Sequence, residues 1–205
     1  DPTESANQAV PRYFASYEET FELPIHRPVR VESVEAVPSG GFRLATSEGV
    51  ILAGSVINAT GTWNRPFVPT YPGLNTFEGL QVHARHYPGA AAFAGQSVLV
   101  VGGGTTGVQL TQDLHQGGAT PIWSTRGIPR WTQTDFDANW GRDVERRVTA
   151  RTSAGLRPLS VVAATGIPLA PRYVPDIEAG LLITRGPIVS FHPQAVTLDG
   201  PGPTG

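Results

Sequence analysis

The chain has 205 residues, of which 40% are hydrophobic and 16% charged, a composition that can bury one sizeable core or two modest ones. A formal net charge of −2 argues against electrostatic attraction to nucleic acid or to an anionic membrane surface. The absence of cysteine excludes disulfides, thiolate metal ligands and paired redox cysteines. No apolar run approaches the roughly 20 residues that span a bilayer, and no signal peptide is recognisable. We therefore expect a cytoplasmic protein that acts on small molecules.

The N-terminal part of the chain predicts a helix followed by an antiparallel β-meander. Residues 1–24 carry aromatic side chains at three- and four-residue steps, so we expect an amphipathic helix whose aromatic face packs into a core. These side chains are Tyr13, Phe14, Tyr17 and Phe21. Three short β-rich runs separated by turns predict the meander, and a fourth apolar run predicts a strand that ends in a glycine turn. The four runs cover residues 29–37, 42–44, 49–52 and 55–61.

A strand, a glycine-rich turn, a helix and a second strand follow one another between residues 97 and 124. The turn consists of Gly102, Gly103, Gly104, Thr105, Thr106 and Gly107. This order predicts an α/β fold with a Rossmann-like NAD(P)-binding domain and its parallel sheet, next to the antiparallel meander. Gly102 permits the tight turn, Gly104 lets backbone approach a pyrophosphate, and Gly107 lets the helix pack close to the strand. The alternative is an ordinary glycine turn between a strand and a helix.

The residues after the second strand favour NADPH over NADH. NAD sites carry an acidic side chain about 20 residues after the first glycine, whereas NADP sites supply a cation for the 2′-phosphate. No carboxylate lies between Asp113 and Asp135, and Arg126 stands at the end of the strand. Its guanidinium matches phosphate geometry, so we expect it to contact the 2′-phosphate. The hydroxyls of Ser124 and Thr125, and Arg130, are further candidates, and the alternative for both arginines is a plain surface charge.

The last third predicts one helix and two strands. Asp135 is expected to cap a helix with an apolar side and an opposite charged side. The apolar side consists of Phe136, Trp140, Val144 and Val148, and the charged side of Arg142, Asp143, Arg146 and Arg147. We expect the charged side to be a solvated face rather than a binding patch. Residues 188–191 and 195–198 predict the strands, and no pattern for a metal site or a dedicated acid–base pair occurs.

Three separated features resemble the class B flavoprotein monooxygenases, which include flavin-containing and Baeyer–Villiger monooxygenases. Residues 77–88 resemble that family's fingerprint, F-x-G-x-x-x-H-x-x-x-(W/F/Y), with Phe77, Gly79, His83 and Tyr87 at its defined positions. The sequence Asn-Ala-Thr-Gly at 58–61 is similar to the family's strand end before the crossover to the NADPH domain. The glycine loop with Arg126 downstream is the third feature. They follow one another in the family's order and spacing.

The resemblance implies an FAD- and NADPH-dependent oxidoreductase that transfers one oxygen atom from O2 to a small organic substrate. It implies that His83 positions NADPH or shuttles protons, whereas the residues alone equally allow a linker histidine bonded to backbone. It also implies that Thr60 and Gly61 line part of a flavin site. Tyr87 stands where ketone-oxidising relatives prefer Trp, which favours heteroatom oxidation. Substrate and oligomeric state are left open.

The sequence departs from this family at both ends. Residues 1–60 contain no glycine-rich loop for the FAD pyrophosphate, and a second strand expected after Asp199 is missing. We therefore expect a fragment with three parts: a remnant of the FAD-binding domain at 1–65, a linker with the fingerprint at 66–94, and an incomplete NADPH-binding domain at 95–205. A non-catalytic NADPH-binding module is the alternative function. A disulfide reductase of the same architecture would need redox cysteines, which this chain lacks.

Overall fold

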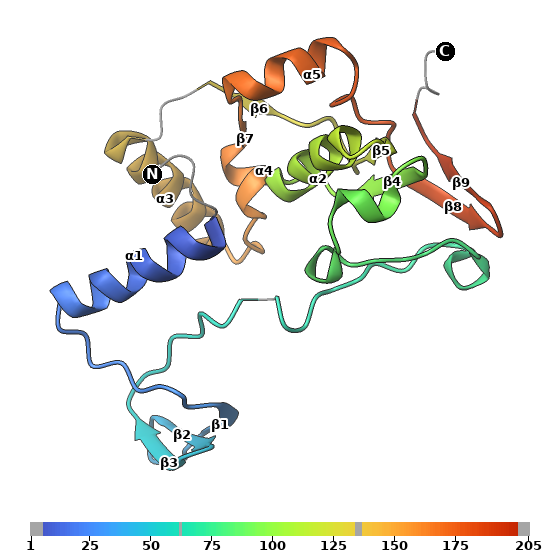
Figure 1. The fold of residues 1–205 in the computed structure, drawn as a ribbon. Helices are drawn as coiled ribbons and strands as arrows, with labels where there is room; N and C mark the ends of the chain where they lie inside the picture. Colours follow the sequence, from blue (N-terminus) through green and yellow to red (C-terminus); the bar gives the residue numbers. More distant parts are fainter. Residues whose placement is uncertain (1–5, 62, 134–136, 201–205) are drawn as a thin grey trace. The chain divides into compact units, whose positions relative to one another are not determined.

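The computed structural model describes residues 6–61, 63–133 and 137–200. The chain forms two compact units, residues 1–61 and 62–205, each with its own secondary structure (Figure 1). The fold is mixed α/β, with small antiparallel and parallel sheets. This confirms the predicted fold class at the level of its sheets.

The first unit consists of one helix and the predicted meander. Helix α1 covers Ala6–Thr20. Strands β1 (Val31–Ala36), β2 (Phe42–Thr46) and β3 (Gly49–Ala53) form an antiparallel sheet in chain order. The turn between β2 and β3 is closed by the buried Thr46 hydroxyl, which donates to the Gly49 carbonyl oxygen at 2.7 Å and accepts from the Glu48 amide at 3.1 Å. The alternation of apolar residues and turns therefore predicted this sheet correctly.

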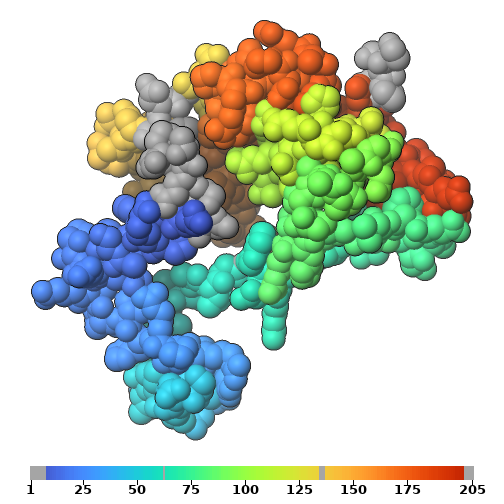
Figure 2. Space-filling model, viewed as in Figure 1, coloured from blue at the N-terminus to red at the C-terminus, as the bar shows by residue number. Residues whose placement is uncertain are grey.

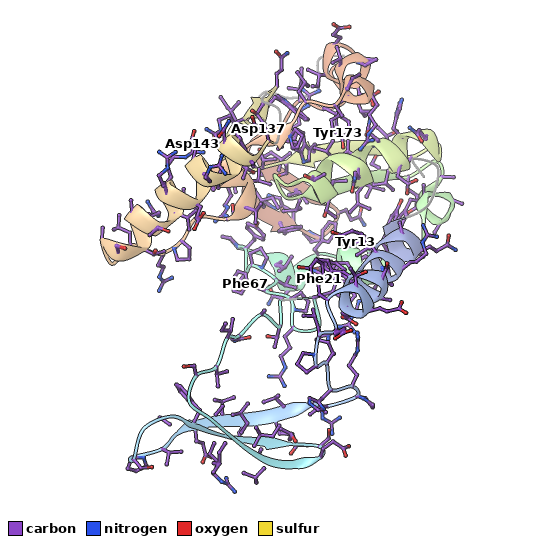
Figure 3. The ribbon with its side chains drawn as sticks, turned by 90° about the vertical axis from the view of Figure 1, so that its left-hand side faces the viewer. Tyr13, Phe21, Phe67, Asp137, Asp143 and Tyr173 are labelled. Carbon is purple, nitrogen blue, oxygen red and sulfur yellow. The ribbon has the colours of Figure 1, made fainter. Side chains whose placement is uncertain are left out.

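The aromatic side of α1 does not pack into a core, contrary to our expectation. Tyr13, Phe14, Tyr17 and Phe21 are 42–63% exposed (Figure 3). Their rings contact one another instead, with centroids 4.5 Å apart between Tyr17 and Phe21 and 5.5 Å apart between Tyr13 and Phe14. The physical reason is that the buried apolar side chains of the described chain all lie in the second unit. The spacing predicted the helix correctly, but the prediction that its aromatic side chains are buried was wrong.

The predicted strand at 55–61 is also absent. These residues have no regular secondary structure, and Ile57 is 93% exposed. A strand needs a neighbour that shares its backbone hydrogen bonds, and no strand pairs with 55–61 among the residues that the structure describes. Local order comes instead from Asn58, whose Oδ1 accepts from the amide and the hydroxyl of Thr60 at 3.2 and 2.8 Å.

The second unit is built on the predicted strand, glycine loop, helix and strand. Strands β4 (Ser97–Val101) and β5 (Thr120–Ser124) pair in parallel, with Val101 opposite Ser124. Helix α2 (Thr105–Gln116) connects them and begins three residues earlier than expected, because Gly104 is its N-cap. Thr105, Thr106 and Gly107 therefore form the first helical turn.

The remaining elements of the second unit surround this core. Strands β6 (Trp131–Thr132) and β7 (Ile167–Pro168) pair in parallel. The two predicted C-terminal strands are β8 (Ile188–His192) and β9 (Ala195–Leu198), which pair with each other antiparallel. Helices α3 (Ala138–Ser153), α4 (Val161–Thr165) and α5 (Val174–Glu178) complete the regular structure with four short 3₁₀ helices. The latter are η1 (Leu74–Thr76), η2 (Ala84–His86), η3 (Ala90–Phe93) and η4 (Pro171–Tyr173). The large aromatic rings of the core meet in a row, from Trp123 to Trp131 and on to Tyr173.

Helix α3 is capped by Asp137 rather than by Asp135. The Oδ1 atom of Asp137 accepts a hydrogen bond from the Trp140 amide at 2.7 Å (Figure 3), because a capping side chain must sit directly before the helix to reach its first free amides. Asp135 and Phe136 lie outside the described residues. The predicted two-sidedness is confirmed for the rest: Trp140, Val144 and Val148 are half-buried, whereas Arg142, Asp143, Arg146 and Arg147 are exposed.

Gly107→Ala is expected to destabilise the second unit because the added methyl group has no room. An ideal Cβ at this position would lie 2.3 Å from the Gly102 carbonyl oxygen, so the loop and helix must separate, at a cost of about 1–3 kcal/mol. Chemical denaturation measures the change. Gly141→Ala is the matched control, since it lies inside α3 with open space around it and is expected to gain roughly 0.5–1 kcal/mol in helix propensity. Equal stability of both variants would contradict the close helix–strand packing.

Candidate functional site

The glycine loop is held against the end of strand β5 by two hydrogen bonds. The Gly102 amide donates to the Ser124 carbonyl oxygen at 3.0 Å, and the Trp123 indole Nε1 donates to the Gly102 carbonyl oxygen at 2.8 Å. Trp123 is 1% exposed, so its N–H has no access to water and needs this partner. The loop conformation is thus set from the β5 side, with Gly102 at a φ of 139° that favours glycine.

The other side of the loop is open. A Cβ added to Gly102 would meet nothing within 4 Å, and one added to Gly104 would meet only the Val162 side chain, at 3.8 Å. Thr105 and Thr106 begin α2, and the first amides of a helix have no partner within it. Such amides, at the positive end of the helix dipole, favour an anion. The space above Gly102 and Gly104 therefore fits the pyrophosphate of a dinucleotide.

Ser124 and Thr125 are brought to the loop, but their hydroxyls are used inside the protein. Both residues are buried, and a Cβ on Gly103 would lie 3.5 Å from Thr125. The Ser124 hydroxyl donates to the Gly186 carbonyl oxygen at 2.8 Å. Thr125 bonds the Thr184 hydroxyl through its amide and its own hydroxyl, at 3.1 and 2.7 Å. These contacts fix the end of β5 to residues 184–186.

The two candidate arginines lie in different surroundings. Arg126 follows directly after the buried end of β5 and is exposed; within the described part of the chain, no hydrogen bond or ion pair occupies its guanidinium. Arg130 lies at the beginning of β6, where its Nη2 donates to the Ala164 carbonyl oxygen of α4 at 3.4 Å. Arg126 thus keeps its guanidinium exposed directly after the end of β5, whereas Arg130 is bonded to α4.

His83 precedes the short helix η2 and is bonded to backbone. Its Nδ1 accepts from the Arg85 amide at 3.1 Å, and its ring meets the edge of Trp63 with centroids 6.3 Å apart. Arg85 in turn donates to the carbonyl oxygens of Trp63 and Asn64 at 3.3 and 3.2 Å. Because Nδ1 is an acceptor, the neutral ring carries its proton on Nε2. The ring thus presents an N–H donor on its other side.

Phe77 and Gly79 attach the fingerprint, residues 77–88, to strand β8 of the same unit. The Phe77 ring packs on Phe191 of β8 with centroids 5.2 Å apart, and Gly79 leaves the room that this ring occupies. Glycine is needed at position 79 for a steric reason, since a Cβ there would lie 2.4 Å from the Phe77 ring. The backbone of residues 72–78 also bonds residues 191–193, as the neighbouring surfaces in Figure 2 illustrate.

Tyr87 anchors the end of the fingerprint to helix α2. Its hydroxyl donates to Asp113 Oδ2 at 2.7 Å, and its ring stacks on Phe93 at a centroid distance of 5.8 Å. Burial raises the pKa of Tyr87, and the hydrogen bond and negative charge of Asp113 raise it further. Sequence reasoning missed Asp113 and Trp123 as partners of the site, because neither lies near its partner in the chain.

Thr60 and Gly61 belong to the first unit and lie in an exposed stretch without regular structure, with Gly61 at a φ of 64°. Among the described residues, no group of three or more metal-ligating side chains occurs, and no helix is long and apolar enough to cross a membrane.

Comparison with known proteins decides the family. The model of the pyridine nucleotide-disulphide oxidoreductase family matches residues 2–162. The chain belongs to this family. These 205 residues contain no cysteine and therefore no redox-active disulfide.

Two of three proteins similar to this chain are described as monooxygenases, and the third as an oxidoreductase. The chain is 32% identical over 139 residues to the probable indole-3-pyruvate monooxygenase YUCCA4 of Arabidopsis thaliana, covering 66% of this chain and 33% of that protein. It is 33% identical over 104 residues to an uncharacterized CzcO-like oxidoreductase of Geobacillus kaustophilus, covering 51% and 30%. The solved flavin-containing monooxygenase of Stenotrophomonas maltophilia matches with a TM-score of 0.70 and 31% identity, over 92% of this chain and 50% of that one. The chain thus spans about a third to a half of these relatives.

Tyr87→Phe is expected to lower the free energy of unfolding by about 1 kcal/mol, the typical worth of one hydrogen bond. A folded-state pKa above the ordinary value of 10.0 means that this stabilisation is complete below pH 10 and is lost as the pH rises further. Denaturation of both proteins from pH 7 to 11 should therefore show a constant difference that shrinks above pH 10. Tyr71→Phe is the control, since the Tyr71 ring packs on Phe191 and no hydrogen bond of its hydroxyl occurs within the described residues. Equal losses for both variants would contradict the anchoring role of Tyr87.

Proposed function

We propose that the glycine loop binds NADPH, with the pyrophosphate over Gly102, Gly103 and Gly104 and against the first turn of α2. The observation that carries this proposal is the open face of a loop whose opposite face is fixed by Trp123. Thr105 and Thr106 supply amides at the helix start, and Gly107 allows the helix to approach the strand. Ser124 and Thr125 support the ribose end by holding the end of β5 in place.

The selectivity for NADPH rests on charge. Arg126 offers a free guanidinium next to the loop, and a guanidinium binds a 2′-phosphate through two parallel hydrogen bonds. The nearest preceding carboxylate, Asp113, is bonded to Tyr87 and lies on α2. Arg130 bonds α4 and contributes at most long-range attraction to the phosphate.

We infer that the whole protein is a flavin-dependent monooxygenase that acts on a small organic substrate and O2. The family membership and the monooxygenase relatives support this. FAD, if bound, would supply the hydride acceptance and the O2 activation that oxygen transfer requires. His83 orients the nicotinamide carboxamide through its Nε2–H, and Tyr87 and Phe77 hold the segment that carries it. Heteroatom oxidation is the reaction that we propose, because Tyr87 replaces the Trp of ketone-oxidising relatives.

The residues of this chain fit only part of an FAD site. Thr60 and Gly61 form an exposed stretch, held by Asn58, whose backbone could contact a flavin. Residues 1–60 contain no glycine-rich loop for the FAD pyrophosphate. This observation favours a second candidate function for these 205 residues by themselves, a module that binds NADPH without catalysis.

Absorbance and oxygen uptake separate these functions. The monooxygenase proposal predicts that the protein binds added FAD, with a shifted flavin spectrum, and consumes O2 when NADPH and an amine or sulfide are supplied. His83→Ala is expected to slow flavin reduction while NADPH binding stays within about twofold. A protein that is stabilised by NADPH and neither binds FAD nor consumes O2 would establish the module and refute catalysis by this chain.

Arg126→Ala is expected to weaken NADPH binding by about 10- to 100-fold, the loss of a charge-assisted contact, and to leave NADH binding unchanged. Calorimetric titration with both nucleotides measures this. Gly104→Val should abolish binding of both, because the side chain fits the protein but occupies the pyrophosphate position. Arg142→Ala, on the exposed side of α3, is the control for general charge loss. Equal weakening of NADPH and NADH by Arg126→Ala would refute the 2′-phosphate contact.

A further inference from the structure

A hollow outside the glycine loop lies between β6, α3 and the end of α4. It has a volume of about 650 Å³ and is open to solvent on one side, within the range of small-ligand pockets. Its lining residues are Arg130, Trp131, Thr132, Trp140, Asp143, Arg146, Arg147 and Thr165. Asp143, Arg146 and Arg147 of the charged side of α3, which we expected to be a plain solvated face, thus form one wall of this hollow; Figure 3 labels Asp143 on this helix.

The charges that line the hollow are predominantly positive. Asp143 forms an ion pair with Arg146, so these two charges offset each other. Among the described residues, Arg147 bonds the Asp143 backbone carbonyl through its Nε, at 3.3 Å, and Arg130 bonds the Ala164 carbonyl. Neither contact neutralises a guanidinium. Within the described part of the chain, these two guanidiniums have no carboxylate partner, and guanidiniums bind a carboxylate through paired hydrogen bonds.

The rest of the lining is aromatic. Trp131 and Trp140 line the hollow and are both half-buried. The Trp131 ring also packs on Trp123 and Tyr173 of the core, which hold it in place beside the hollow. Indole faces pack well against flat rings. A hollow with two tryptophans and two uncompensated arginines suits a ligand with a flat apolar part and an anionic end.

The hollow is separate from the proposed dinucleotide site. The side chains that a Cβ on Gly103, Gly104 or Gly107 would approach are those of Thr125, Val162 and Trp123, and none of these lines the hollow. The two sites share helix α4, which contributes Val162 to one and Thr165 to the other.

We propose that this hollow binds a small aromatic carboxylate. The carboxylate contacts Arg130 and Arg147, and the ring lies against Trp131 and Trp140. Binding needs neither FAD nor NADPH, so this inference stands independently of the proposed monooxygenase function.

Calorimetric titration of the full chain with 1-naphthoate tests the proposal, with 1-naphthalenemethanol as the neutral probe of the same ring. We expect 1-naphthoate to bind at least tenfold more tightly. Arg147→Gln and Arg130→Gln should each weaken it by about tenfold, the worth of one charge-assisted contact. Arg142→Gln is the matched control, because Arg142 is an exposed arginine of the same helix that bonds Asn139 and does not line the hollow. Circular dichroism verifies that each variant is folded.

Saturating NADPH should leave the affinity for 1-naphthoate unchanged. Competition by NADPH would show that the hollow is part of the dinucleotide site and overturn the proposal. Equal affinity for the alcohol, or an equal loss in Arg142→Gln, would also overturn it, by showing binding without the two arginines. Gly104→Val is expected to lose NADPH binding and to keep 1-naphthoate binding. Failure of the unsubstituted chain to bind NADPH, with 1-naphthoate still bound, would refute the proposed dinucleotide function and leave this site intact.

Discussion

The hydrogen bond between the Trp123 indole and the Gly102 carbonyl oxygen is the contact on which the candidate site depends. A buried indole N–H without a partner would lower the free energy of unfolding by about 1–3 kcal/mol. The hydrogen bond from Trp123 to Gly102 avoids this loss and holds the loop against β5. That approach is possible only because Gly107 has no side chain, since a Cβ there would meet both Gly102 and Trp123. One face of the loop is consequently occupied by protein. The opposite face keeps its amides and its space for a ligand.

The parts of the fold that sequence predicted well are those whose causes are local. Strand β4, the glycine loop, helix α2 and strand β5 follow one another within 28 residues, and each is encoded by its own pattern of apolar residues and glycines. The predictions for 55–61 and for the aromatic side of α1 were wrong because pairing and burial depend on neighbours. A strand-like or amphipathic pattern indicates which conformation a segment favours. It does not indicate whether another strand pairs with the segment or another element covers its apolar side.

The same distinction applies to the candidate site. The spacing of the glycines was enough to predict the loop. The absence of a carboxylate after β5, where Arg126 stands instead, was enough to select Arg126 as a candidate. The use of the Ser124 and Thr125 hydroxyls by residues 184–186 could not be predicted, because about 60 residues separate the partners. The hollow beside Arg130 was equally hidden, since it forms only where α3 packs near α4 and β6. Charged side chains on a helix can line a binding site only where a second element packs beside the helix and encloses a space.

The spacing of the fingerprint has a mechanical explanation in this structure. Residues 77–87 form little regular structure, so their position is set by anchors at both ends. Phe77 packs on β8 at one end, and Tyr87 bonds Asp113 of α2 at the other. His83 lies between these anchors, and its bond to the Arg85 amide fixes the direction of its ring. Because Tyr87 is tied to the same helix whose first turn completes the glycine loop, any shift of α2 would also shift the segment that carries His83. The histidine is thereby kept in register with the proposed nucleotide site.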